Sequence, residues 1–168
     1  KDTEVDRLLY ESATEQIKAL SALQTKALQE IKSGFDANRT VLFSGVTGSG
    51  KTEIYIHLIQ EALERSEQVL YLLPEIALTT QLITRLRAVF GEDVGVYHSR
   101  FSEHERVEIW TKVLNWPSEE PVHTNFKTYQ VILGARSALL LPFHKLGLII
   151  VDEEHDSSFK QRDPSPRY

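Results

Sequence analysis

One stretch of eight residues has the types and spacing that bind a phosphate group. Residues 45–52 read Gly-Val-Thr-Gly-Ser-Gly-Lys-Thr, which fits the pattern G-x-x-x-x-G-K-[ST]. Glycines let the backbone come close to an anion, and the loop amides and the N-terminus of the next helix then point donors at it. Lys51 is expected to reach the β- and γ-phosphates, and the Thr52 hydroxyl to bind Mg²⁺. The nucleotide-binding residues predicted in this loop are Gly45, Thr47, Gly48, Ser49, Gly50, Lys51 and Thr52.

An acidic cluster later in the chain supplies carboxylates that could bind Mg²⁺ and activate water beside the phosphate loop. The apolar run 148–151 ends in Asp152-Glu153-Glu154-His155. Mg²⁺ takes few carboxylates beside phosphate oxygens and water, so Asp152 is the predicted metal-side residue. Glu153 is the candidate base that orients the attacking water. A solvated strand end is the alternative for the acids alone; their pairing with a phosphate loop favours a hydrolytic site with Lys51, Asp152 and Glu153 as its catalytic residues.

The elements that must position these residues alternate between strands and helices. Apolar runs predict strands at 40–44, 68–73, 93–98, 129–133 and 146–151. Apolar residues at helical spacing predict helices over 5–20, 23–31, 54–63, about 80–90 and 103–114, the last opened by a capping box of Ser102 and Glu105. This order predicts an α/β fold with a mostly parallel central sheet and helices on both faces. In such sheets ligands bind at the carboxyl ends of the strands, where the phosphate loop and the acids both fall.

Composition narrows the possible functions. The chain has 168 residues, 41% apolar and 26% charged, which is ordinary for one soluble domain. No apolar run approaches the roughly 18 residues of a membrane span, and the start does not resemble a signal peptide, so no membrane partner is expected. No cysteine is present, which excludes disulfides and thiolate metal sites and is compatible with a cytoplasmic location. The net charge of −5 means that any nucleic-acid site must be a local patch.

The two motifs together resemble superfamily 2 helicases, and longer strings resemble the primosomal protein N′ family of bacterial replication-restart helicases. The strings are residues 45–55, 73–79, 133–138 with Pro142-Phe143, and 148–161. The resemblance covers about residues 20–168. It implies the first of two RecA-like lobes of an ATP-driven, 3′-to-5′ DNA helicase with ATP and Mg²⁺ as cofactors. It also implies forked and single-stranded DNA, a second motor lobe, the primosome and single-strand-binding proteins as partners in the bacterial cytoplasm.

The same resemblance assigns further residues. Gln24, which alone could be an exposed helical glutamine, matches the family's adenine-side glutamine. The positions implied to contact or couple to DNA are Pro74, Glu75, Thr79, Arg136, Ser137, His155, Phe159, Lys160 and Arg167. An aromatic ring such as Phe159 can stack on an unpaired base.

The expected organisation has three parts. Residues 1–39 are a helical segment carrying Gln24, residues 40–155 are the RecA-like ATP-binding lobe, and residues 156–168 are a truncated, aromatic-rich DNA-coupling loop. The family's second-lobe arginine and zinc-binding cysteines have no counterpart here, so the chain is interpreted as an excised part that hydrolyses ATP slowly. Two alternatives stay open: a lobe of another superfamily 2 translocase, or a non-catalytic nucleotide- or DNA-docking module.

Overall fold

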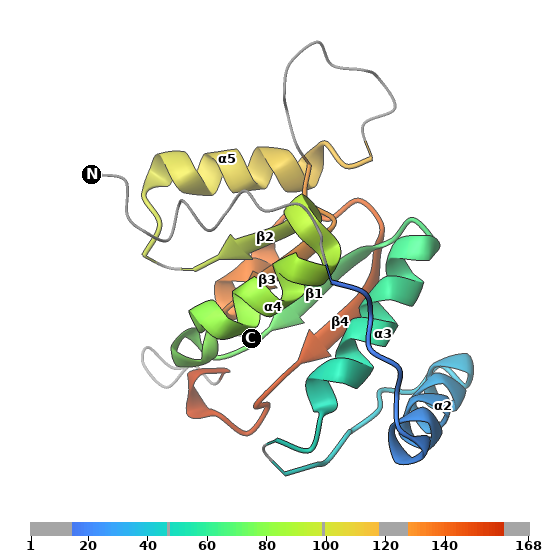
Figure 1. Ribbon diagram of the computed structural model, residues 1–168. Helices are drawn as coiled ribbons and strands as arrows, with labels where there is room; N and C mark the ends of the chain where they lie inside the picture. Colours follow the sequence, from blue (N-terminus) through green and yellow to red (C-terminus); the bar gives the residue numbers. More distant parts are fainter. Residues whose placement is uncertain (1–14, 47, 99, 118–127, 160–168) are drawn as a thin grey trace.

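A parallel sheet forms the centre of the molecule. The structure is a computed structural model that describes residues 15–46, 48–98, 100–117 and 128–159. The strands in these ranges are β1 (Gln68–Leu72), β2 (Val94–Tyr97), β3 (Val131–Gly134) and β4 (Leu146–Val151). They pair in the order β2-β3-β1-β4, all parallel (Figure 1). The predicted site residues Thr47, Lys160 and Arg167 lie outside the described residues, as do positions 1–14.

The register of the sheet brings the strand ends together. Leu72 at the end of β1 is level with Gly134 of β3 and Val151 of β4, and Gly134 is level with Tyr97 of β2. Because all strands run in one direction, the segments that follow them leave from one edge. The predicted clusters after Leu73, Tyr97, Gly134 and Val151 therefore share an end of the sheet.

Helices cover both faces of the sheet, as the alternation of elements predicts. On one face lie α2 (Ala22–Asp36), α3 (Lys51–Glu64) and α4 (Thr80–Phe90), packed over the larger core cluster. On the other lies α5 (Glu103–Leu114), whose Ile109 and Val113 are buried in a second cluster (Figure 1). The α/β class is therefore confirmed. Among the described residues, no helix combines the length and apolar composition that a bilayer span requires.

Side-chain caps fix where three of these helices begin. The predicted capping box of Ser102 and Glu105 is confirmed at the start of α5. A second box, made by Ser21 and Gln24, opens α2, and Thr79 Oγ1 accepts the Leu82 amide at the start of α4. Such caps satisfy amides that have no partner within the helix. Because each cap is made by residues next to the helix start, the starts of α2, α4 and α5 depend on local sequence.

The segment 40–44, predicted as the first strand, has no regular secondary structure and lies outside the sheet. Val41 and Phe43 are half-buried against the larger core, whereas Leu42 between them is 76% exposed. Phe43 packs edge-on against Tyr55 of α3, with ring centroids 6.2 Å apart. Contacts between side chains and helices, rather than a strand ladder, therefore hold this segment, and the prediction of a fifth strand is wrong.

The first predicted helix also fails where the structure describes it. Residues 15–21 form no helix and have no regular secondary structure. The Glu15 amide donates to the Ala88 carbonyl of α4, and the Lys18 carbonyl lies 2.9 Å from His57 Nε2 of α3. These long-range contacts replace the bonds that a helix would make. Ile17 and Leu20 of this segment still pack against the core, which explains the apolar pattern without helix formation.

A fully buried glutamine ties the amino ends of the strands to their neighbours. Gln68 has no exposed surface. Its Nε2 donates to the carbonyls of Val113 (3.1 Å) and Tyr129 (3.4 Å). Its Oε1 accepts from the amides of His144 (2.7 Å) and Lys145 (3.2 Å). One side chain therefore bonds to backbone groups of three separate segments, which are the end of α5, the approach to β3 and the approach to β4.

We expect Gln68→Leu to lower the free energy of unfolding by about 3 kcal/mol, because each buried backbone group left without a partner costs about 1–3 kcal/mol. Equilibrium urea denaturation of the chain measures this change. Gln29→Leu, the same substitution on the exposed surface of α2, is the control and should stay within about 0.5 kcal/mol of the wild type. Equal stability of the two variants would contradict a structural role for the Gln68 amide.

Candidate functional site

The phosphate loop has a conformation that depends on glycine. Gly48 and Gly50 have φ angles of 79° and 82°, in the left-handed region. Gly50 is the N-cap of α3, and a Cβ at this position would collide with the Gln24 amide. The Ser49 amide donates to the Val46 carbonyl at 3.1 Å, which closes the turn. The loop is open to solvent and ends at the N-terminus of α3, so its remaining amides can receive an anion.

Lys51 lies over this loop. Its Nζ donates to the Gly45 carbonyl at 2.5 Å, so the ammonium group bridges the two ends of the turn. The side chain is half-buried, and the hydroxyl-bearing Thr52 follows it in the first turn of α3. A phosphate seated in the loop would therefore meet a positive charge without a large movement of the lysine backbone.

Gln24 is joined to the loop from α2. Its Nε2 donates to the Gly50 carbonyl at 3.2 Å, and its Oε1 accepts the Ser21 amide at 2.9 Å. Both ends of the amide are thus occupied. The contact places the predicted adenine-side residue against the phosphate loop, 26 positions away in sequence, and α2 is held to α3 by it.

Asp152 leaves the carboxyl end of β4 with both carboxylate oxygens engaged. Its backbone amide donates to the Leu72 carbonyl of β1 at 2.8 Å. Oδ1 accepts the Glu153 amide at 3.1 Å, and Oδ2 accepts the Tyr71 hydroxyl at 2.9 Å. The carboxylate is half-buried, so it has a fixed position and a solvent-facing side.

Two buried tyrosines connect Asp152 to the helix that begins in the phosphate loop. Tyr71 of β1 packs edge-on against Tyr55 of α3, with centroids 5.7 Å apart. Burial, with a further contribution from the Asp152 and Glu153 charges, raises the pKa of Tyr55 to about 12. Burial and then the Asp152 charge also raise the pKa of Tyr71, so this phenol stays protonated and is the donor. The acids and the start of α3 therefore lie at the same end of the sheet.

Glu153 has a backbone conformation that is uncommon for its type. Its φ is 53°, in the left-handed region, and its carbonyl accepts the Asp156 amide at 2.8 Å. His155 Nε2 lies 3.5 Å from Glu153 Oε2. Strained residues of this kind concentrate at functional sites. The turn directs the Glu153 carboxylate to solvent, where its side chain is 44% exposed.

An ion pair behind the loop was not predicted. Arg85 of α4 pairs with Glu53, which follows Thr52 in the first turn of α3. The Arg85 and Glu53 side chains are only 28% and 21% exposed, so the pair is better protected from solvent than an ordinary surface pair. It joins the phosphate-loop helix to α4, the helix that Thr79 caps.

The other predicted residues follow the remaining strand ends. Pro74 is buried, and Glu75 opens a single 3-10 turn, η2 (Glu75–Ala77). Arg136 is exposed at the start of η4 (Arg136–Leu140), and the adjoining Ser137 Oγ is buried without a hydrogen-bond partner. Phe159, in η5 (Ser157–Phe159), is half-buried against the second core cluster.

Comparison with known proteins decides the family. The family model described as DEAD/DEAH box helicase matches residues 21–167. The chain belongs to the DEAD/DEAH box helicase family. The match extends across α2, the phosphate loop, the whole described sheet and the acidic turn.

Three curated relatives of this chain share one name. The protein "Replication restart protein PriA" of Helicobacter pylori (strain J99) is 41% identical over 165 residues, which are 98% of this chain and 24% of the relative. Proteins of the same name from Synechocystis and Bacillus subtilis are 42% and 40% identical, over 91% and 86% of this chain and 17% of each relative. The chain therefore spans a quarter or less of the length of these relatives.

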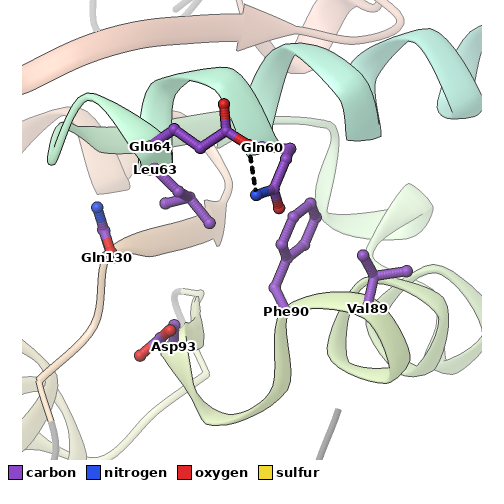
Figure 2. Close-up of a pocket in the computed structure, with 7 residues that line it drawn as sticks. All are labelled: Gln60, Leu63, Glu64, Val89, Phe90, Asp93 and Gln130. Carbon is purple, nitrogen blue, oxygen red and sulfur yellow. Dashed lines mark hydrogen bonds between the residues drawn. The ribbon is translucent and has the colours of Figure 1, made fainter. Parts of the chain in front are cut away.

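A cavity of about 370 Å³ in the helicase domain lies away from these residues. It opens between α3 and α4 at the amino ends of the strands, since Asp93 and Gln130 precede β2 and β3 (Figure 2). Burial raises the pKa of Asp93. The residues that line it are Gln60, Leu63, Glu64, Val89, Phe90, Asp93 and Gln130. The phosphate loop, by contrast, forms an open surface at the opposite end of the sheet.

Three residues that contact the candidate site were not predicted by sequence analysis. Tyr55, Tyr71 and Arg85 carry no motif of their own, and Tyr71 reads only as one residue of a buried strand. A signal existed for Tyr71, because a tyrosine in a fully buried strand must find a partner for its hydroxyl. The sequence does not reveal that the partner is Asp152, 81 positions away.

Proposed function

We propose that this chain is the ATP-binding lobe of a bacterial, ATP-dependent 3′-to-5′ DNA helicase that restarts stalled replication forks. The observation that carries the proposal is that the phosphate loop and the acidic turn lie at the same end of the sheet. The phosphate loop and Asp152 are linked there through Tyr55 and Tyr71. The name shared by relatives about 40% identical supports the choice of replication restart.

The nucleotide would be held by the loop and by α2. Backbone amides of the predicted loop residues would receive the phosphates, with Lys51 giving up the Gly45 carbonyl to bind the β- and γ-oxygens. Gln24 would present its amide to adenine, whose edge offers a donor and an acceptor. Because both ends of that amide are bonded to Ser21 and Gly50, adenine binding there requires exchange of at least one of these bonds.

Mg²⁺ fits the donors that lie at this edge. Thr52 offers a hydroxyl and Asp152 a fixed carboxylate, which are hard oxygen ligands suited to this ion. When bound, Mg²⁺ neutralises charge that develops on the phosphates. Glu153 would accept a proton from the attacking water, because its carboxylate is exposed beside Asp152.

DNA would contact the segments that follow β1 and β3. Pro74, Glu75 and Thr79 follow β1, and Arg136 and Ser137 follow β3. Ser137 Oγ is buried and has no hydrogen-bond partner in the described structure, so a contact with DNA would require this oxygen to become exposed. His155 and Phe159 would couple DNA to Glu153, and Lys160 and Arg167 would add charge. In this proposal 1–39 is the adenine-side segment, 40–155 the lobe and 156–168 the DNA-coupling loop.

Within the longer protein, we place this lobe beside a second motor lobe that supplies an arginine to the transferring phosphate. Such an arginine is worth about 10³–10⁵ in rate in related enzymes. The proposed partners are forked and single-stranded DNA, the primosome and single-strand-binding proteins in the bacterial cytoplasm. The isolated chain should bind ATP weakly, hydrolyse it slowly and fail to unwind DNA.

The experiment that tests this function compares polynucleotides. We expect ATP hydrolysis by the longer protein to rise at least about tenfold with single-stranded DNA and much less with RNA of the same sequence, while this chain alone shows neither response, because it lacks a second lobe. A coupled assay of phosphate release measures all three rates. Preference for RNA would indicate another superfamily 2 translocase, and nucleotide binding without turnover by the longer protein would indicate a docking module.

A further inference from the structure

The carboxylate of Asp152 has a neighbour that no motif assigns. Tyr71 donates its hydroxyl to Oδ2 at 2.9 Å, while the Glu153 amide occupies Oδ1 at 3.1 Å. Two donors from different directions fix the plane of a carboxylate. Of the two, the Glu153 amide belongs to the same turn as Asp152, whereas Tyr71 belongs to β1 in the middle of the sheet.

Tyr71 is more deeply buried than the carboxylate it contacts. It has no exposed surface, and its ring packs edge-on against Tyr55, at an interplanar angle of 79°. Tyr55 in turn packs at 84° against Phe43. The three rings form an aromatic column that starts two residues before the phosphate loop, passes through α3 and ends at the Asp152 carboxylate. Edge-to-face packing of this kind is a favoured arrangement of aromatic pairs.

We propose that Tyr71 is a positioning residue that holds the Asp152 carboxylate in the orientation required to bind Mg²⁺ beside the phosphate loop. The inference rests on the proposed nucleotide site and names a residue that acts through Asp152 rather than on the substrate. Partners that orient metal ligands commonly contribute about 10–100-fold to metal affinity or activity. Because Phe43 and Tyr55 flank the phosphate loop in sequence, the column also fixes the position of the Asp152 carboxylate relative to that loop.

The test is Tyr71→Phe in the longer protein. The substitution retains the ring and removes only the hydroxyl. We expect the Mg²⁺ concentration for half-maximal ATP hydrolysis to rise roughly tenfold. In calorimetric titrations, ADP affinity with Mg²⁺ should fall by a similar factor, while ADP affinity in EDTA should stay within about twofold of the wild type, since the loop contacts need no Asp152.

Tyr129→Phe is the matched control. Tyr129 lies at the amino end of β3, where its hydroxyl is 3.5 Å from Lys112 Nζ, so its loss should leave all three quantities unchanged. An unchanged Mg²⁺ dependence in Tyr71→Phe would overturn the inference and leave the proposed function intact. Equal losses with and without Mg²⁺ would also overturn it, because they indicate a merely structural tyrosine. If the wild-type protein binds no nucleotide, the proposed function fails first, and this inference with it.

Discussion

Replacing Glu153 by Gln in the longer protein is expected to slow DNA-stimulated ATP hydrolysis by about 10²–10⁴-fold, the usual contribution of a general base. Gln keeps the size of the side chain and its hydrogen-bonding reach but accepts no proton at neutral pH. Because no hydrogen bond or ion pair joins Glu153 to the phosphate loop among the described residues, ATP affinity should change by less than about threefold. Phosphate release under saturating ATP and a separate nucleotide titration measure the two effects.

Glu154→Gln is the control for this substitution. Glu154 is the next residue, is exposed and has no role in the proposed site. The two variants undergo the same chemical change one position apart, so any effect of lost charge alone would appear in both. If Glu153→Gln hydrolyses ATP and unwinds DNA as fast as Glu154→Gln, the assignment of this chain to a motor is wrong.

The second large effect is expected for Lys51→Ala. A hydrogen bond to a charged group contributes about 1.5–3 kcal/mol, which corresponds to a loss of roughly 10–150-fold in ATP affinity. The Lys51 ammonium group lies over the loop, 2.5 Å from the Gly45 carbonyl, and no other lysine is bonded to the loop in the described residues. Titration with a fluorescent ATP analogue measures the affinity, and unwinding should be lost at ATP concentrations that saturate the wild type.

Lys26→Ala provides the comparison for the loss of a lysine. Lys26 lies on the exposed surface of α2, 3.9 Å from Glu30, and its side chain is 75% exposed. Surface pairs of this kind contribute about 0–1 kcal/mol, so stability and ATP affinity should hardly change. Equal ATP affinities for Lys51→Ala and Lys26→Ala would show that the loop does not bind the nucleotide through its lysine.

Much of the fold could be predicted from local patterns. The strands β1 to β4 begin and end within about two residues of the apolar runs that predict them, and the box of Ser102 and Glu105 marks the start of α5. These features depend on residues close together in sequence, for which periodicity and capping are direct physical signals. The parallel arrangement followed from their alternation with helices.

Two predictions failed for a common reason. The segments 15–21 and 40–44 have apolar patterns that suggest a helix and a strand, but neither forms one. In both, side chains contact the core while the backbone bonds elsewhere or lacks a sheet partner: the Glu15 amide, for example, bonds to Ala88. An apolar pattern reports burial of side chains, and the regular structure that achieves burial depends on neighbours distant in sequence.

By itself, the sequence determined the chemistry available to this protein: a glycine-rich turn before Lys51, acids after an apolar strand and an alternation that brings both to one edge. Only the tertiary structure decided how these groups are held. Gln68 bonds to segments 45 or more positions away, and Tyr71 reaches Asp152 across 81 positions. Such contacts arise because a parallel sheet places distant strands side by side, so their partners are fixed by strand order and register rather than by spacing along the chain.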